Sequence, residues 1–151
     1  MALISQRRLL EIIDDDRVKA AIVAAEKLTS GEMRVSVSRF FWGNVQRAAH
    51  RAFIRLGMRA TRDRNGILFF VVPSRRRFAI IGDQGIHQKV GQEFWEKLVA
   101  AMSEDFKAGK FNEGLIRGIA EAGRLLGLHF PYAGDKDVNE LPDDIDHGDK
   151  E

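Results

Sequence analysis

Residues 61–85, TRDRNGILFFVVPSRRRFAIIGDQG, contain two apolar runs on either side of a charged turn, and Asp, Asn and Gly bracket both runs. The first run, residues 67–72, is continuously apolar, as expected for a central strand that is buried on both faces. Pro73 ends it, because proline cannot donate a hydrogen bond to a ladder. Residues 78–81 form the shorter partner strand after the turn. The stretch therefore predicts a β-hairpin whose polar ends lie close together.

A strand pattern and a helix pattern precede the hairpin. Met33, Val35 and Val37 alternate with polar residues, which is typical of a half-buried strand. Further along, Asn44 is a suitable N-cap for an amphipathic helix that Gly57 ends. The order strand, helix, hairpin predicts an α/β fold with a small mixed sheet.

Two groups of residues resemble metal ligands but have simpler interpretations. The three consecutive aspartates of residues 14–16 precede a helical pattern. Capping explains them better than metal binding, since neighbouring side chains at a helix start point in different directions. The histidines are dispersed, so a zinc site made from them is not expected. They are His50, His87, His129 and His147.

Helical periodicity follows the hairpin. Apolar residues recur every four positions from Ile86 to Phe106 and predict one long helix that ends near Gly109. Asn112 is then expected to cap a last helix. Four glycines in that helix favour a smooth packing strip over a phosphate-binding loop, because the flanking sequence lacks the phosphate-loop context. They are Gly114, Gly118, Gly123 and Gly127.

The composition limits the class of protein. The chain has 151 residues, of which 44% are hydrophobic, enough for one domain with its own core. It contains no cysteine, so disulfides, iron–sulfur clusters and Cys-ligated zinc are excluded, and no haem is expected. The sequence shows neither a secretory signal nor a run of about 18 to 20 apolar residues that would span a bilayer. We therefore expect a cytoplasmic protein.

The domain layout follows from where periodicity begins and ends. We expect a helical extension over residues 1–13, an α/β domain over 14–131 and an acidic, disordered tail over 132–151. The tail has 8 acids and 2 lysines, and its NELPDDIDH run is either a short linear motif or a segment that folds back on the basic half. Residues 1–80 carry a formal charge of +9 and residues 81–151 one of −7. Internal compensation is the favoured interpretation of this asymmetry.

Nucleic acid is not an expected partner. The arginine triplet of residues 75–77 forms a turn between strands, and no aromatic stacking pattern accompanies it. A solvated turn explains the triplet.

The polar ends of the hairpin predict a candidate site. Asp63, Asn65 and Asp83 offer hard oxygen ligands of the kind that Ca²⁺ and Mg²⁺ prefer. Glu32 also approaches them if its strand runs in the right direction, and Gly82 allows close approach of the backbone, as do Gly66 and Gly85. In the alternative interpretation, Asp63 and Asn65 only shape a loop while Asp83 caps the next helix.

Several motifs occur in an order that resembles the TPM domain family. They are AEKLTSGEMRV at residues 25–35, the hairpin at 65–86, Trp95, and FKAGKFNEGLIRGIAEAGRLL at 106–126. The resemblance covers roughly residues 14–131. The closing LGLHFP and NELPDD suggest the soluble bacterial branch of a family that also includes thylakoid-lumen, phosphatase-like proteins.

The resemblance implies a three-layer α/β/α sandwich and a metal-dependent acid phosphatase-like activity that uses Ca²⁺ or Mg²⁺. The motif positions that it marks are Glu32, Asn65, Gly66, Gly82, Asp83 and Gly85. In the first hypothesis, Asp83 and Asp63 hold the metal with help from Asn65. Arg62 or Arg64 would neutralise a phosphate, and His87 would protonate the leaving group.

The second hypothesis is a non-catalytic interaction module, for example an assembly or repair factor with a protein partner. Phe40, Phe41 and Trp42 follow a predicted strand directly. Three consecutive aromatic side chains cannot all face one core, so at least one is a candidate for a partner surface; alternatively, they pack under the next helix.

Overall fold

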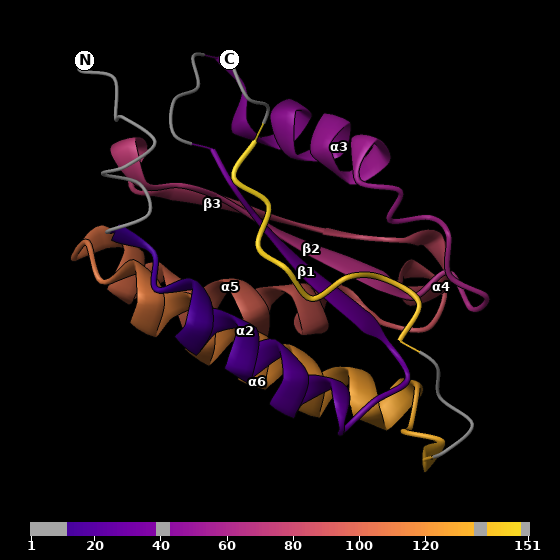
Figure 1. Cartoon of the computed structure of the whole chain (residues 1–151). Coiled ribbons are helices and arrows are strands. Elements are labelled where there is room, and N and C mark those ends of the chain that lie inside the picture. The colour runs from indigo at the N-terminus through magenta and orange to yellow at the C-terminus, as the bar shows by residue number, and fades with distance from the viewer. Residues whose placement is uncertain (1–11, 39–42, 135–138, 149–151) are drawn as a thin grey trace.

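The computed structural model describes residues 12–38, 43–134 and 139–148, which form a three-layer α/β/α sandwich around a small mixed sheet (Figure 1). Strand β1 pairs in parallel with β2, and β2 pairs antiparallel with β3, in the order β1-β2-β3. The fold class predicted from the sequence is confirmed. In chain order the elements are α2 (Asp15–Glu26), β1 (Glu32–Val37), α3 (Val45–Arg55), β2 (Gly66–Val72), η1 (Pro73–Arg75), β3 (Arg77–Gly82), α4 (Gln84–His87), α5 (Gln92–Lys107) and α6 (Phe111–His129).

The predicted hairpin lies at the centre of this sheet. All residues of β2 are buried, which explains why its sequence shows no alternation. Its register with β3 pairs Val72 with Arg77 at the turn and Ile67 with Gly82 at the open end. The short 3₁₀ helix η1 and Arg76, in the left-handed region with φ of 50°, close the turn. The central strand and its partner are therefore where the sequence predicted them.

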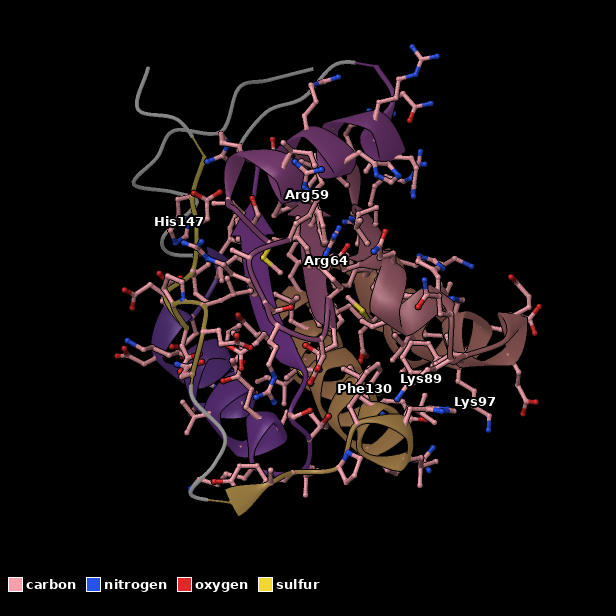
Figure 2. All side chains as sticks on the ribbon, turned by 90° about the vertical axis from the view of Figure 1, so that its right-hand side faces the viewer. Arg59, Arg64, Lys89, Lys97, Phe130 and His147 are labelled. Atoms are coloured by element: carbon pink, nitrogen blue, oxygen red, sulfur yellow. The ribbon has the colours of Figure 1, made fainter. Side chains whose placement is uncertain are left out.

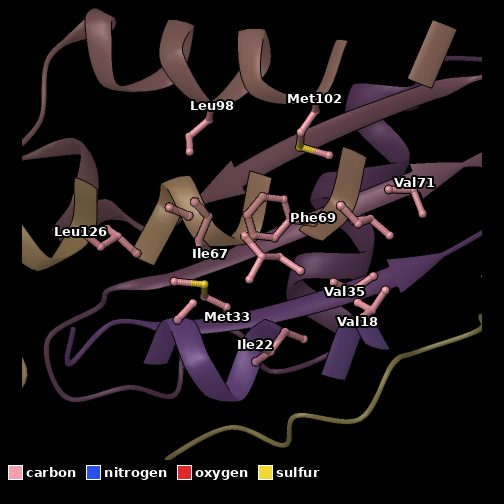
Figure 3. Close-up of a cluster of buried hydrophobic side chains, with 14 of the residues drawn as sticks. Val18, Ile22, Met33, Val35, Ile67, Phe69, Val71, Leu98, Met102 and Leu126 are labelled. Carbon is pink, nitrogen blue, oxygen red and sulfur yellow. The ribbon is translucent and has the colours of Figure 1, made fainter. Parts of the chain in front are cut away.

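The larger core lies between one face of the sheet and helices α2, α5 and α6 (Figure 3). Odd-numbered residues of β1 and β2 supply the sheet side of this core, which includes Met33, Val35, Val37, Ile67, Phe69 and Val71. Leu98 and Met102 of α5 and Leu126 of α6 reach them from the helical layer. Across the described residues, no helix has the length and apolar composition needed to cross a membrane.

Helix α3 covers the opposite face of the sheet. Its buried residues contact the even-numbered side chains of β2, among them Leu68 and Phe70. Asn44 caps this helix as predicted, since its side chain accepts from the Arg47 N–H at 2.9 Å. Asp14 caps α2 in the same way, accepting from Arg17 at 3.2 Å, so at least the first of the three aspartates has the capping role that we predicted.

The glycines of α6 form the packing strip that their spacing predicted. A Cβ on Gly118 would lie 2.5 Å from the Met102 sulfur, and one on Gly123 would lie 2.9 Å from the Ala25 Cβ. Because both distances are shorter than real Cβ contacts, only glycine lets α5 and α2 approach α6 this closely. This close packing offsets the helix-propensity cost of these glycines.

Two helix boundaries differ from the prediction. The single helix expected from Ile86 to Gly109 is divided into α4 and α5, because the chain is extended at Gly91, the N-cap of α5. Asn112 does not cap α6, which starts one residue earlier. Its side chain accepts from the Asp14 N–H at 2.8 Å and donates to the Ile12 carbonyl at 3.0 Å. Except for residues 12 and 13, the helical extension predicted over residues 1–13 lies outside the described residues.

The C-terminal segment, residues 139–148, lies along β1 (yellow in Figure 1). Val37 donates its N–H to the Asp146 carbonyl at 2.7 Å, and Asp146 donates to the Val35 carbonyl at 3.0 Å. Leu141 is buried under the α3 layer. This part of the chain is therefore packed, in contrast to the disordered tail that we expected. Of the two alternatives for the NELPDDIDH run, its described residues follow the folded-back one.

Candidate functional site

The strand register brings the predicted polar ends together at one end of the sheet. Glu32 lies opposite Gly66 in the parallel pair, and Asp83 donates its N–H to the Gly66 carbonyl at 2.9 Å. Asn65 accepts from the Glu32 N–H at 3.3 Å through its carbonyl. The parallel direction of β1, which the sequence left open, is what brings Glu32 here.

The predicted close approaches at the glycines are contacts of the chain with itself. A Cβ on Gly85 would lie 2.2 Å from the Asp63 carbonyl oxygen, so α4 packs directly on the loop before β2. A Cβ on Gly66 would lie 2.8 Å from the Met58 carbonyl, and one on Gly82 would lie 2.4 Å from the ring of Trp95. These glycines tighten the end of the sheet.

The carboxylate of Asp83 is buried, and both of its oxygens accept hydrogen bonds. Arg64 donates to both of its oxygens, at 2.7 Å from Nε and 2.9 Å from Nη2. The Gln84 N–H donates to Oδ1 at 2.8 Å, which caps α4. Arg64 adopts a φ of 50°, an uncommon conformation for a residue other than glycine. Asp83 thus has the helix-capping geometry that we set against metal binding.

The other predicted oxygen donors point to separate partners. Asp63 is 45% exposed and lies 3.7 Å from the Arg62 guanidinium. Asn65 is buried, its Nδ2 donates to Ser30 Oγ at 3.4 Å, and its Oδ1 has no hydrogen-bond partner among the described residues. The backbone positions converge, but these side chains do not meet at a common point. Among the described residues, no three His, Cys, Asp or Glu side chains are grouped for a metal ion.

The predicted acid, His87, lies on the exposed side of α4. Its ring stacks on Trp95 with centroids 4.8 Å apart. Near it, the Lys89 Nζ lies 4.6 Å from the ring centroid of Phe130. Figure 2 shows Lys89 beside Phe130 and Arg64 further along the same side of the molecule. The Arg62 side chain is 78% exposed and lies 3.7 Å from Asp63, whereas Arg64 is engaged with the buried Asp83.

An acidic cluster that the sequence did not predict as a unit joins the end of α2, the start of β1 and the C-terminal segment. It consists of Glu26, Glu32, Glu140 and Asp143. Glu26 Oε2 accepts from the Met33 N–H at 3.0 Å, and Glu32 Oε1 accepts from the Leu141 N–H at 2.9 Å. Only Glu32 was in the predicted site, because Glu140 and Asp143 reach it through the folded-back segment and Glu26 comes from the end of α2.

Two carboxyl groups of this cluster, those of Glu26 and Glu32, have raised pKa values. Burial raises the pKa of Glu26 to about 9, and the negative charges of Glu32 and Asp143 add to the effect against the Met33 hydrogen bond. Burial likewise raises the pKa of Glu32 to about 7, helped by Glu140 and Asp143. The charges acting on these two groups are all negative, so the cluster favours a proton or a cation.

The proposed aromatic surface lies outside the described residues. Phe40, Phe41 and Trp42 belong to the stretch 39–42, so their role stays a prediction.

The geometry defines a three-layer α/β/α protein with polar residues at one end of its sheet, where β1 and β2 begin and β3 ends. A family model described as the TPM domain matches residues 4–125, and the chain belongs to this family. The NMR structure of the BA42 protein from the psychrophilic bacterium Bizionia argentinensis is 37% identical, with a TM-score of 0.84 over 92% of this chain and 94% of that one.

Two more distant solved structures share the fold. The N-terminal domain of cg2496 protein from Corynebacterium glutamicum is 13% identical, with a TM-score of 0.60 over 88% of this chain and 78% of that one. An N-terminal domain of a P. gingivalis protein is 14% identical, with a TM-score of 0.60 over 87% and 98% of the two chains. No match was found among functionally curated proteins.

Proposed function

We propose that this protein is a divalent-cation-binding, phosphatase-like TPM protein, and that the acidic cluster holds the cation. The observation that carries the proposal is the gathering of Glu26, Glu32 and Asp143 from three segments, in which the charges that act on Glu26 and Glu32 are negative. Lys19 lies on the Asp143 side of the cluster and pairs with Asp144. Carboxylate oxygens are the ligands that Ca²⁺ and Mg²⁺ prefer. The family model that matches the chain also carries phosphatase in its name.

The hairpin end fits a cation less well than the cluster does. Both oxygens of Asp83 already accept from Arg64, and the Gln84 N–H takes a further position on Oδ1. A cation at Asp83 would have to displace the guanidinium. We therefore move the proposed ion from Asp83, Asp63 and Asn65 to the cluster and retain Glu32 from the predicted set.

In the cluster, a cation takes the place that protons otherwise hold. Glu26 and Glu32 resist ionising together because they are buried near like charges. A divalent ion offsets that repulsion, so binding should release protons and strengthen as the pH rises. The three carboxyl groups are not spaced as ligands in the described structure, so binding needs their side chains to turn toward one another.

A phosphoester would meet the same end of the sheet. A bound divalent ion polarises a phosphoryl oxygen, which favours attack by water. Arg62 is suited to neutralise the phosphate. Its backbone N–H donates to Glu140 Oε2 at 3.1 Å, which holds the residue next to the cluster, while its side chain is 78% exposed. His87 stays a candidate proton donor from the exposed face of α4.

Amide chemical shifts during titration with CaCl₂ and MgCl₂ test the cation step. Saturable shifts are expected at residues 26, 32 and 139–144, with about tenfold weaker binding in Glu32→Gln, which keeps an oxygen for the Leu141 N–H. Asp83→Asn is the matched control and should bind normally. Shifts confined to residues 61–66 and 82–87, or none, would overturn the placement.

Hydrolysis of an aryl phosphate with and without the same ions tests the chemistry separately. The metal-stimulated rate should fall in Glu32→Gln and in Arg62→Ala, and His87→Gln should change its pH profile. Equal rates for these variants and the unmodified protein, with metal bound, would reject the phosphatase step while leaving cation binding intact.

The alternative function, an interaction module without catalysis, is favoured by one specific feature. The outer edge of β3 has no covering segment among the residues that the structure describes.

A further inference from the structure

The outer edge of β3 presents backbone groups in a regular row. Because Asp83 donates to the Gly66 carbonyl, residues 66 and 83 are a hydrogen-bonded pair of the antiparallel ladder. Pairs alternate along such a ladder, so the N–H and C=O groups of Phe78, Ile80 and Gly82 point away from β2. Within the described ranges, none of these groups has a hydrogen-bond partner.

Arginines lie at the turn that leads into this edge and in the first turn of α3. Arg47 and Arg77 are exposed, and neither has a carboxylate partner in the described part of the chain. Arg75 donates to the Gly43 carbonyl at 2.9 Å, and Arg76 donates to the Lys107 carbonyl at 3.0 Å. These acceptors are neutral, so within the part of the chain that the structure describes none of these four arginines pairs with a carboxylate.

A pocket lies where the edge begins. It has a volume of about 340 Å³ and is lined by residues 43–46 of the α3 N-terminus and 77–79 of β3. The first N–H groups of a helix lack partners within the helix and favour a negative charge. With Arg77 on the opposite wall, the pocket suits a carboxylate side chain.

We propose that the outer edge of β3 is a docking site for an extended acidic segment of a partner protein, which adds to the sheet as a fourth strand. Main-chain hydrogen bonds to Phe78, Ile80 and Gly82 supply the pairing. Arg47 and Arg77 select acidic side chains over basic ones. The proposal is independent of cation binding.

The molecule already uses this mode once within its own chain. At the other edge of the sheet, Asp146 pairs through its backbone with Val35 and Val37. In the same acidic segment, Asp144 pairs with Lys19, and the Asp146 side chain pairs with Arg55. The β3 edge offers similar chemistry, a ladder with arginines at its start, and no segment of the described chain pairs with it.

Titration of the full-length, isotope-labelled protein with a blocked peptide of alternating aspartate and valine tests the proposal. We expect saturable amide shifts at residues 43–46 and 77–82. The double variant Arg47→Glu/Arg77→Glu should weaken binding by about tenfold or more. A lysine–valine peptide, and an aspartate–valine peptide methylated on its pairing amides, should not bind.

Two further variants separate the explanations. Arg59→Glu changes the charge of an exposed residue away from this edge by as much as each single change of the double variant, and it should bind the peptide normally. Ile80→Pro removes an outward N–H without breaking the ladder to β2 and should abolish binding. If Ile80→Pro does not fold, comparison of the Arg47→Glu/Arg77→Glu variant with Arg59→Glu still tests whether the peptide binds at this edge. The proposal is overturned if millimolar peptide causes no amide shifts, or if the shifts are confined to the β1 edge. It is also overturned if the amide shifts at residues 77–82 change with protein concentration in the absence of peptide, because that result would indicate pairing with a second copy.

Discussion

The two edges of the sheet differ in whether their backbone groups are paired. At β1, the outward N–H of Met33 donates to Glu26 Oε2, and the outward groups of Val35 and Val37 pair with Asp146. At β3, the outward groups of Phe78, Ile80 and Gly82 meet no partner among the described residues. A strand edge with unpaired groups invites another strand. The difference teaches that the C-terminal segment is part of the fold at one edge, while the other edge keeps its pairing capacity.

The covered edge is secured by side chains as well as by backbone. Asp146 Oδ2 accepts from Ser36 Oγ at 2.8 Å and from Arg55 at 2.9 Å. Leu141 is only 5% exposed and packs into the α3 layer. Polar and apolar anchors therefore fix the register of the segment on β1.

The largest effect is expected at the apolar anchor of the covered edge. Leu141→Ala removes a buried side chain and should lower the free energy of unfolding by about 2 kcal/mol, the low end for such a change because the segment can detach locally. Urea unfolding measures it. Leu128→Ala is the control, since Leu128 is 72% exposed, and a comparable loss there would remove the special role of the segment.

A smaller effect is expected at the polar anchor. Asp146→Ala removes the hydrogen bonds that Asp146 accepts from Ser36 and Arg55 and should lower the free energy of unfolding by about 1 kcal/mol. Burial opposes ionisation of Asp146, but the hydrogen bonds from Arg55 and Ser36 outweigh it and lower its pKa. A carboxyl with a lowered pKa stabilises the fold above its unfolded-state pKa and loses that contribution as the pH falls.

Acid titration of the free energy of unfolding checks this sign. The unmodified protein should lose stability below about pH 4, and Asp146→Ala should lose less over the same range. Parallel curves for the two proteins would mean that the Asp146 contacts do not stabilise the segment.

The central hairpin was predictable because its signal is local. A continuous apolar run, a proline and a charged turn specify β2 and β3 without information from elsewhere in the chain. The glycine strip of α6 was readable for the same reason, since Gly114 and Gly118 recur at helical spacing. The break at Gly91 was missed because the apolar period continues through it from Ile86 to Phe94.

The candidate site was predictable only as a set of backbone positions. Sequence spacing indicated that Asn65 and Asp83 would lie near each other, but not that Arg64 would take both oxygens of Asp83. Glu26 and Asp143 are far apart in sequence and meet only because the C-terminal segment returns to β1. Composition alone made that segment look like a solvated tail.

The acidic cluster beside the covered edge should make stability depend on pH. Glu26 and Glu32 have pKa values of about 9 and about 7 in the fold, above the ordinary value of 4.5. Groups with raised pKa values favour the folded state at low pH and lose that contribution as the pH rises through those values. Between pH 5 and 8.5 the free energy of unfolding should therefore fall by roughly 1 kcal/mol after allowance for solvent screening.

Urea unfolding at both pH values measures this dependence. Glu26→Gln should flatten it, whereas Glu93→Gln, which changes an exposed residue of α5, should not. Under the proposed function, Ca²⁺ should restore stability at pH 8.5 in the unmodified protein. A Glu26→Gln curve that falls as steeply as the unmodified one would contradict the assignment to the cluster.

The smallest effect is expected at the open edge. Arg77→Glu should change the free energy of unfolding by no more than about 0.5 kcal/mol, because its exposed side chain has no carboxylate partner among the described residues. Asp146, its counterpart at the covered edge, is expected to matter more because its contacts hold the fold together. A loss above about 1 kcal/mol in Arg77→Glu would show that this arginine also stabilises the domain. If Arg77→Glu is stable but binds the acidic peptide more weakly, the positive charge of Arg77 serves to recognise the peptide. The two edges would then differ in function as they do in structure.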